Sequence, residues 1–188
     1  VLFRSAELVL LGQRVAQQAE AHQVFEQPVV ERPLVLELQR ADGVRDALEV
    51  VAQAVGVVVE RVDAPLVAGV VVRDLYGTYP DYDIDVPAEQ AAAAAARMIV
   101  LLHPVQWYSM PALLKLWMDE VLSYGWAYGP GGTALQVKDL WLVATTGGPE
   151  SSYHPQSYNR YFFDAFLPPY EQTAALCGMR FIPPLMLH

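Results

Sequence analysis

The sequence predicts an α/β fold in which a doubly wound parallel sheet lies between two layers of helices. Segments of strand character alternate with segments of helical spacing, which is typical of repeated strand–helix–strand units with right-handed crossovers. Two strand segments, Met98–Leu102 and Asp139–Ala144, are almost entirely apolar, as expected for strands covered on both faces. The chain has 188 residues, of which 54% are hydrophobic, so it can bury one substantial core.

The N-terminal third, residues 1–69, is atypical because its pattern is weaker than that of the rest. Apolar residues recur at helical spacing over residues 5–26, and Pro28 and Pro33 then indicate a break. Leu34–Leu38 predicts a strand. A helix over Asp46–Val55 and a short β-branched run at Val57–Val62 complete this segment.

From Val70 to His188 the pattern is regular, and we expect this region to form the ligand-binding part of the fold. The predicted strands are Val70–Leu75, Met98–Leu102, Asp139–Ala144 and the short Arg180–Ile182. The predicted helices are the alanine-rich Ala88–Arg97, which Pro87 opens, the amphipathic Pro111–Tyr124, and Asn159–Cys177, which Pro168 and Pro169 interrupt. Loops are predicted at Tyr76–Pro80 and, rich in glycine, at Gly125–Gly132.

Charge and composition exclude several functions. With 12 basic and 21 acidic residues the formal net charge is −9, which disfavours nucleic acids and anionic membrane surfaces as partners. Cys177 is the only cysteine and the four histidines are scattered, so no metal site is predicted. No apolar run reaches the roughly 18–20 residues of a membrane span. We therefore expect a soluble, cytoplasmic protein.

Two segments follow predicted strands, at the edge where such sheets bind ligands. They are His103–Pro111 and Thr145–Pro149. Adjacent Gly147 and Gly148 would let a flat ligand approach the backbone, and Trp107 with Tyr108 would offer aromatic surfaces.

Each of these features also has a purely structural interpretation. The two aromatic residues could belong to the core, the two glycines could form a plain turn, and His103 could be a core histidine with its hydrogen bonds satisfied. Asp81, Asp83 and Asp85 lack the glycine and distal glutamate of a calcium loop, so a solvated face is favoured. Gly129–Gly132 lacks the lysine of a phosphate-binding P-loop.

The combination of motifs is more specific than its parts. Four segments carry it: His103-Pro104-Val105-Gln106-Trp107-Tyr108-Ser109-Met110-Pro111-Ala112-Leu113-Leu114-Lys115, then Trp117-Met118-Asp119, then Tyr124-Gly125-Trp126-Ala127-Tyr128-Gly129, and then Thr145-Thr146-Gly147-Gly148. In this order they resemble the flavodoxin-like NAD(P)H:quinone oxidoreductases. Within that family, Val72–Tyr76 and Tyr79–Asp85 look most like the ancillary subunits of bacterial glutathione-regulated potassium efflux systems.

The resemblance implies a bound flavin, FMN or FAD, that carries hydride from NADH or NADPH to a quinone. It implies that the loop Pro104, Val105, Gln106, Trp107 and Tyr108 lies against the flavin ring, and that Thr145, Thr146, Gly147 and Gly148 hold the pyrimidine side of the ring. Tyr153 matches a family tyrosine whose hydroxyl reaches the ring. Some members pair that tyrosine with a downstream histidine, for which this chain offers Asn159 at the matching place and His154 beside Tyr153.

The resemblance also implies partners. Family members are commonly homodimers, and the aromatic segment Trp117–Tyr128 would suit a subunit contact or simple core packing. The alternative function is that of a regulatory subunit that docks on a membrane potassium efflux transporter, peripherally at the inner membrane, with secondary or no redox activity.

The N-terminal third departs from the family. Members begin with a strand and a Ser- or Asn-rich loop that binds the flavin phosphate, whereas Gln39–Gly43 after the strand Leu34–Leu38 carries an acid and no Ser, Thr or Asn. A fragment or a chimera upstream of Val70 would explain this difference.

Overall fold

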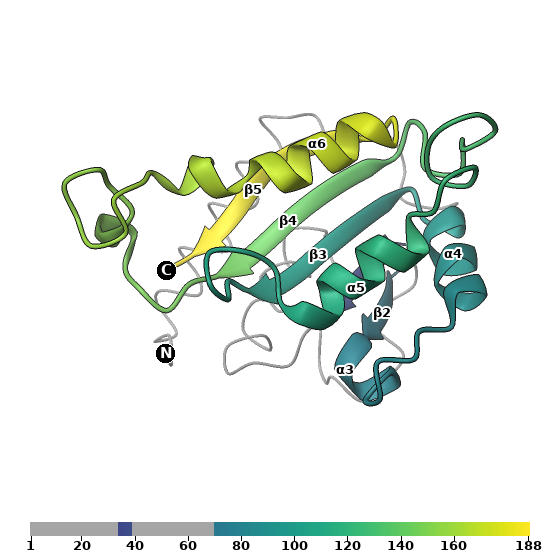
Figure 1. Ribbon diagram of the computed structural model, residues 1–188, viewed down its shortest axis with the longest axis horizontal. Helices are drawn as coiled ribbons and strands as arrows, with labels where there is room; N and C mark the ends of the chain where they lie inside the picture. Colours follow the sequence, from purple (N-terminus) through teal and green to yellow (C-terminus); the bar gives the residue numbers. More distant parts are fainter. Residues whose placement is uncertain (1–33, 39–69) are drawn as a thin grey trace.

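The computed structural model describes residues 34–38 and 70–188, and its centre is a parallel sheet of five strands. The strand order is β2-β1-β3-β4-β5, and every described pair of neighbours is parallel (Figure 1). This order is that of a doubly wound sheet whose switch point lies between β1 and β3, which confirms the predicted α/β class. The strands are β1 (Leu34–Leu38), β2 (Val70–Asp74), β3 (Met98–Pro104), β4 (Asp139–Thr145) and β5 (Arg180–Leu187).

Helices α5 (Ala112–Val121) and α6 (Pro168–Leu176) lie on the same face of the sheet (Figure 1). Between these helices and the strands lies a core of side chains that are almost completely buried, Leu101, Leu113, Trp117, Leu142 and Ala174 among them. The alternate positions of β3 and β4, such as Val100 and Val143, are fully buried as well. Both faces of the central strands are therefore removed from water, as the apolar runs predict.

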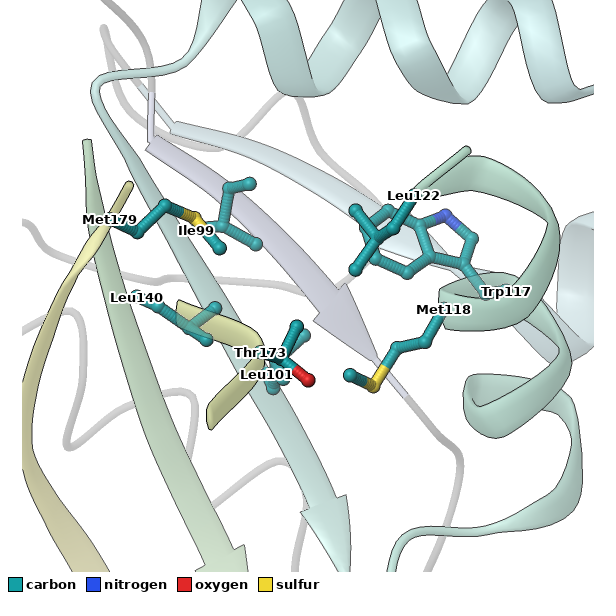
Figure 2. A pocket seen from close by; sticks show the side chains of 8 residues that line it. All are labelled: Ile99, Leu101, Trp117, Met118, Leu122, Leu140, Thr173 and Met179. Carbon is teal, nitrogen blue, oxygen red and sulfur yellow. The ribbon is translucent and has the colours of Figure 1, made fainter. Parts of the chain in front are cut away.

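A small apolar pocket remains where α5 and α6 approach the sheet (Figure 2). Its walls come from β3, β4, α5, α6 and the segments that follow the two helices, and Thr173 is its one side chain with a hydroxyl (Figure 2). The pocket belongs to the core, because its lining is otherwise aliphatic, aromatic or thioether. The lining residues are Ile99, Leu101, Trp117, Met118, Leu122, Leu140, Thr173 and Met179.

The expected loop at Tyr76–Pro80 is wrong in its first half, because the chain forms a one-turn helix, α3 (Leu75–Thr78). Strand β2 ends at Asp74, whose carboxylate accepts a hydrogen bond from Gly77 N at 2.9 Å and so caps this turn. A Cβ at Gly77 would lie 2.7 Å from an Asp74 side-chain oxygen. A side chain at this position would therefore displace the capping carboxylate of Asp74.

The helix expected at Asn159–Cys177 is also wrong over its first half. Residues 159–167 are irregular except for a 3₁₀ turn, η2 (Phe163–Phe166), and α6 begins only at Pro168. Proline has no N–H and its backbone φ angle suits the first helical turn, so the two prolines start the helix instead of interrupting it.

Strand β5 is longer than the expected Arg180–Ile182, although it contains Pro183 and Pro184. It lies at the edge of the sheet, where one side of the strand needs no partner for its N–H groups. The pairing with β4 is irregular between Trp141 and Val143, and Trp141 Nε1 donates to Pro183 O at 3.1 Å. The edge position therefore allows a strand here, although the two prolines cannot donate backbone hydrogen bonds.

The remaining boundaries shift by a few residues. The alanine-rich helix is α4 (Val86–Ala95), which Asp85 caps by accepting from Ala88 N at 3.0 Å. Strands β3 and β4 run to Pro104 and Thr145, two and one residues beyond the predicted ends, and α5 is shorter than Pro111–Tyr124. The strand Leu34–Leu38 is confirmed as β1. The elements expected at residues 5–26, 46–55 and 57–62 lie outside the described residues.

The buried carboxylate of Glu89 connects α4 to β2, to α5 and to Tyr79, the residue that follows α3. Glu89 is completely buried and forms an ion pair with Arg73 of β2, whose Nε lies 3.1 Å from Oε1. The Tyr79 hydroxyl donates to the same oxygen at 2.7 Å, and Trp117 Nε1 donates to Oε2 at 3.0 Å. Burial and the neighbouring Glu89 raise the pKa of Tyr79 to about 12, so Tyr79 remains a donor at neutral pH.

Within the described residues, no helix is long and apolar enough to cross a membrane.

The aspartates of the loop before α4 are exposed at Asp81 and Asp83, as the solvated-face interpretation predicts.

Val137 has an unfavourable backbone conformation that a substitution should relieve. Its φ angle is +60°, and its side chain is 97% exposed. A β-branched residue is strained there, whereas asparagine tolerates this region. We expect Val137→Asn to raise the free energy of unfolding by about 0.5–1 kcal/mol, measured by urea denaturation. The control is Leu176→Asn, which also replaces an exposed apolar residue but lies in α6. An equal gain in both variants would contradict the assignment to backbone strain.

Candidate functional site

The two loops singled out by the sequence lie side by side at the carboxyl edge of the sheet. Val105 N donates to Thr145 O at 2.8 Å, which joins the loop after β3 to the end of β4. Thr146 N donates to Leu187 O at 2.8 Å, which adds the end of β5. The parallel register of β3 and β4 puts Pro104 opposite Thr145, so adjacent strand ends carry the two loops (Figure 1).

The loop after β3 contains a strained turn. Gln106 and Ser109 exchange two backbone hydrogen bonds of 3.0 Å, and the residues between them, Trp107 and Tyr108, have φ angles of +47° and +66°. Two positive φ angles in a two-residue hairpin define a type I′ turn, which normally takes Asn-Gly. Strain of this kind costs about 1–3 kcal/mol per residue and is concentrated at functional sites.

The turn displays its aromatic side chains instead of burying them. Trp107 is 93% exposed, so the core interpretation of this residue is wrong. The backbone N–H groups of Trp107 and Tyr108 form no hydrogen bond within the part of the chain that the structure describes. An exposed indole beside two available donors is suited to bind a flat ligand that carries carbonyl or ring-nitrogen acceptors.

Tyr108 connects this turn to the arm, the segment of residues 149–167 that extends away from the sheet between β4 and α6 (Figure 1). The ring of Tyr108 stacks on Phe166 with centroids 5.4 Å apart and an angle of 26° between the planes. Its hydroxyl donates to Asn159 Oδ1 at 3.4 Å. The structure thus brings the predicted residue Asn159 to the predicted residue Tyr108.

Tyr153 lies at the base of the arm in an aromatic setting. Its ring centroid lies 5.2 Å from that of Phe163, 6.3 Å from Phe166 and 5.5 Å from His188. Burial raises the pKa of Tyr153, and the nearby Thr146 side chain opposes part of that rise. Tyr153 is therefore a protonated hydroxyl at neutral pH.

The segment Thr146–Gly148 leaves room along its backbone. A Cβ at Gly147 would have no atom within 4 Å, and at Gly148 it would meet only the Ser152 side chain, at 3.4 Å. Neither glycine has a φ angle in the left-handed region, so neither the turn nor the packing of the described residues requires glycine. The backbone N–H groups of both glycines form no hydrogen bond among the described residues. This open, donor-lined strip fits a flat ring with acceptors on its edge, such as the isoalloxazine of a flavin.

His154 is the predicted site residue that the structure turns away from this cluster. Its ring is exposed and meets the ring of Phe162 edge-on at 4.8 Å, while its Nδ1 accepts a hydrogen bond from Gln156 N at 3.5 Å. His154 therefore lies apart from the contacts that Tyr153 makes.

His103 is a core histidine with both ring nitrogens hydrogen-bonded. It is 1% exposed, with Nδ1 at 2.9 Å from Pro104 O and Nε2 at 3.1 Å from the Tyr170 hydroxyl. A carbonyl only accepts, so Nδ1 carries the proton and Nε2 accepts from Tyr170. Burial lowers the pKa of His103 to about 4, with the bond to Pro104 O acting in the opposite direction.

This buried imidazole should make stability depend on pH. The unfolded chain takes up a proton near pH 6.5, whereas native His103 stays neutral down to about pH 4, so stability is lost as the pH falls through that range. We expect the wild-type protein to lose about 2–3 kcal/mol more than His103→Gln between pH 7.5 and 4.5, in urea denaturation at both values. An equal pH dependence of the two proteins would contradict this assignment.

Sequence reasoning missed three residues of the site. Phe163 and Phe166 were expected in a helix, and His188 in no element at all. The only sequence signal for the two phenylalanines was the repetition of aromatic residues in the arm. Nothing in their spacing indicated that their rings would contact those of Tyr108 and Tyr153. The loop Gln39–Gly43 lies outside the described residues. It directly follows β1, whose last residue pairs with Leu102 of β3.

Residues 52–188 match a family model described as flavodoxin-like fold. The chain is 54% identical over 120 residues to the glutathione-regulated potassium-efflux system ancillary protein KefF of Citrobacter koseri, a match that covers 64% of this chain and 67% of that protein.

Solved structures give the same fold. General stress protein 14 of Treponema denticola, solved in complex with FMN, is 30% identical with a TM-score of 0.69, and the match covers 83% of this chain and 86% of that one. An NADPH-quinone reductase from P. pentosaceus is 24% identical with a TM-score of 0.66, covers 84% of each chain and is similar in fold.

Proposed function

The chain belongs to the flavodoxin-like fold family, and on this premise we propose that it is a flavin-dependent NAD(P)H:quinone oxidoreductase. The observation that carries the proposal is the pair of loops at the carboxyl edge of β3 and β4. There an exposed indole and four backbone N–H groups stand around a strip without side chains. The FMN complex of a 30% identical structure supports FMN as the flavin.

The residues that would hold the flavin are those of the two loops. Pro104, Val105, Gln106, Trp107 and Tyr108 would lie against the ring. Gly147 and Gly148 would bind its acceptor edge through their backbone N–H groups, and Thr145 and Thr146 would hold this segment at the strand ends. The flavin supplies the redox chemistry, accepting hydride from NADH or NADPH and passing two electrons to a quinone. The protein supplies fixed donors where negative charge develops, which is the electrostatic part of catalysis.

Tyr153 would be the residue that places a proton at the reacting atoms. Burial raises its pKa further above neutral, so it is protonated at pH 7, and its ring packs beside Phe163 and Phe166. Tyr108 and Asn159 form the adjacent wall. One site would serve both substrates in turn, which predicts ping-pong kinetics.

The second candidate function is regulation of a membrane potassium efflux transporter, which the 54% identity to KefF favours. In that case the protein would be cytoplasmic and peripheral at the inner membrane, attached through the transporter. The regulatory function would use the same fold as the enzyme. For either function the protein would be a homodimer. The two functions differ in whether transporter binding needs the flavin.

The test is to express the chain, release any bound cofactor and identify it by mass, and then titrate the protein with FMN and with FAD. We expect flavin binding together with quinone-dependent oxidation of NADH or NADPH. Flavin binding without quinone reduction, combined with retention on transporter-containing membranes by a flavin-free variant, would favour the regulatory function. A protein that binds neither flavin would overturn the proposed enzyme.

A further inference from the structure

The strip formed by Gly147 and Gly148 has little support of its own in the candidate site. Neither backbone N–H forms a hydrogen bond among the described residues. A Cβ at Gly147 would meet nothing within 4 Å, and a Cβ at Gly148 would meet only the Ser152 side chain. Glycine has more backbone freedom than any other residue, so two adjacent glycines adopt many conformations unless another group holds them. The order of the two donors must therefore come from a neighbouring side chain.

The Thr146 hydroxyl is the neighbouring group that holds the strip. Its Oγ1 donates to Gly148 O at 2.7 Å and so closes a short turn over Gly147. Among the described residues this is the only hydrogen bond made by the backbone of the two glycines. Thr146 is itself buried, and its backbone N–H donates to Leu187 O at 2.8 Å. The hydroxyl therefore connects the strip to the fixed edge of the sheet.

His188 supplies a second hydrogen bond to the same hydroxyl. Its Nδ1 lies 2.9 Å from Thr146 Oγ1. A hydroxyl has one proton, and the Gly148 carbonyl can only accept it, so His188 Nδ1–H must be the donor to Thr146. A hydroxyl that accepts one hydrogen bond donates a stronger one, because each bond polarises the next. His188 therefore strengthens the bond that holds Gly148.

The fold keeps His188 in this place. Strands β4 and β5 are parallel with Thr145 opposite Leu187, so the residue that follows β5 lies beside the segment that follows β4 (Figure 1). The rings of Tyr153 and Phe163 lie against the imidazole, with centroids 5.5 and 6.3 Å away. These rings of the arm restrict rotation of the His188 side chain.

We propose that Thr146 and His188 are positioning residues, and that the bonds from His188 to Thr146 and from Thr146 to Gly148 O hold the strip in the conformation that binds the edge of the flavin. The inference rests on the proposed function, because it names the residues that prepare the same site. Both side chains act through the backbone of the strip. If the strip is ordered in only a fraction of the molecules, the apparent Kd for the flavin rises by the inverse of that fraction.

The binding test is a titration of the flavin-free protein with FMN, in two matched pairs of variants. Thr146→Val removes the hydroxyl with little change of shape, and Thr146→Ser keeps it. His188→Leu removes the donor, and His188→Asn puts an amide N–H near the position of Nδ1. We expect Thr146→Val and His188→Leu to raise the Kd for FMN about 10–100-fold, with Thr146→Ser and His188→Asn close to wild type. Wild-type affinity in both Thr146→Val and His188→Leu would overturn the proposal.

A double variant shows whether His188 acts through Thr146. Once valine has removed the hydroxyl, His188 has no acceptor there, so adding His188→Leu to Thr146→Val should weaken FMN binding no further. If the two effects multiply instead, His188 contributes independently of Thr146 and the proposal is wrong.

The control for the loss of a hydroxyl is Thr173→Val. It removes another hydroxyl that donates to a backbone carbonyl, Pro169 O at 2.7 Å, in α6. The affinity for FMN should stay at the wild-type value. A loss of affinity equal to that of Thr146→Val would assign the effect to general destabilisation and would overturn the proposal.

A second measurement needs neither flavin nor turnover. Nitrogen-15 relaxation of the flavin-free protein gives the order parameters of the Gly147 and Gly148 amides, whose signals are assigned by their loss in the corresponding alanine variants. We expect values of about 0.85 in the wild type and in Thr173→Val, as in rigid backbone, and below about 0.6 in Thr146→Val and His188→Leu.

The two measurements separate this proposal from the proposed function. Mobile glycine amides in the wild type, or amides that stay rigid in Thr146→Val and His188→Leu, would overturn the role of the two residues even in a protein that binds FMN. Rigid wild-type amides that lose order in both variants, in a protein that binds no flavin, would support the role of the pair in holding the strip and would overturn the proposed function.

Discussion

Replacing Glu89 with alanine is expected to lower the free energy of unfolding by about 3–5 kcal/mol, the range for a buried ion pair that loses one partner. The carboxylate is completely buried and accepts from Arg73, Tyr79 and Trp117. Without it, the Trp117 N–H and the Tyr79 hydroxyl lose the acceptor that they share, and Arg73 loses its ion pair with Glu89. Urea denaturation at pH 7 measures the loss.

Two further variants separate charge from hydrogen bonding. Glu89→Gln keeps an acceptor but removes the negative charge, so it should cost clearly less than alanine. Asp119→Ala breaks the exposed pair of Asp119 with Lys115 in α5 and should change stability by less than about 1 kcal/mol. If Glu89→Ala is as mild as Asp119→Ala, the buried network does not stabilise the fold as argued.

Gly147→Val is expected to weaken flavin binding by about 100-fold or more, equivalent to about 2.7 kcal/mol, while the protein stays folded. A Cβ at Gly147 meets no atom within 4 Å in the described structure, so the side chain costs the flavin-free fold little. In the proposed complex the same space holds the ring, and a branched side chain there would keep the ring from the backbone donors. Titration of the apoprotein with FMN, followed by quenching of flavin fluorescence, gives the affinity.

Gly147→Ala is the matched smaller substitution and should weaken binding less than valine does. Circular dichroism and the thermal midpoint of both variants report whether the fold persists. Wild-type affinity for FMN in a folded Gly147→Val protein would show that the flavin, if it binds, does not use this strip.

Much of the fold follows from local sequence pattern. The apolar runs of β3 and β4 predicted buried parallel strands, and the turn chemistry around Pro87 predicted the start of α4 within two residues, because both depend on neighbours along the chain. The two loops after β3 and β4 were also predictable, since the carboxyl ends of parallel strands meet at one edge. Pro168 and Pro169 were misread because a proline that starts a helix and one that interrupts it have the same sequence signal.

The sequence by itself therefore determined the α/β class, the central strands and the loops Pro104–Tyr108 and Thr145–Gly148, all of which depend on short-range pattern and on the rule that adjacent strands align. Only the tertiary structure decided which distant residues complete the site. Phe166 contacts Tyr108 although the two residues are 58 positions apart in the sequence, because the arm folds back toward the loop after β3. His188 contacts Thr146 across 42 positions, because β5 pairs with β4 in parallel. Glu89 is completely buried in the structure, and nothing in the alanine-rich segment around it indicates this burial. Such contacts depend on side chains brought together across the sheet, and no local preference encodes them.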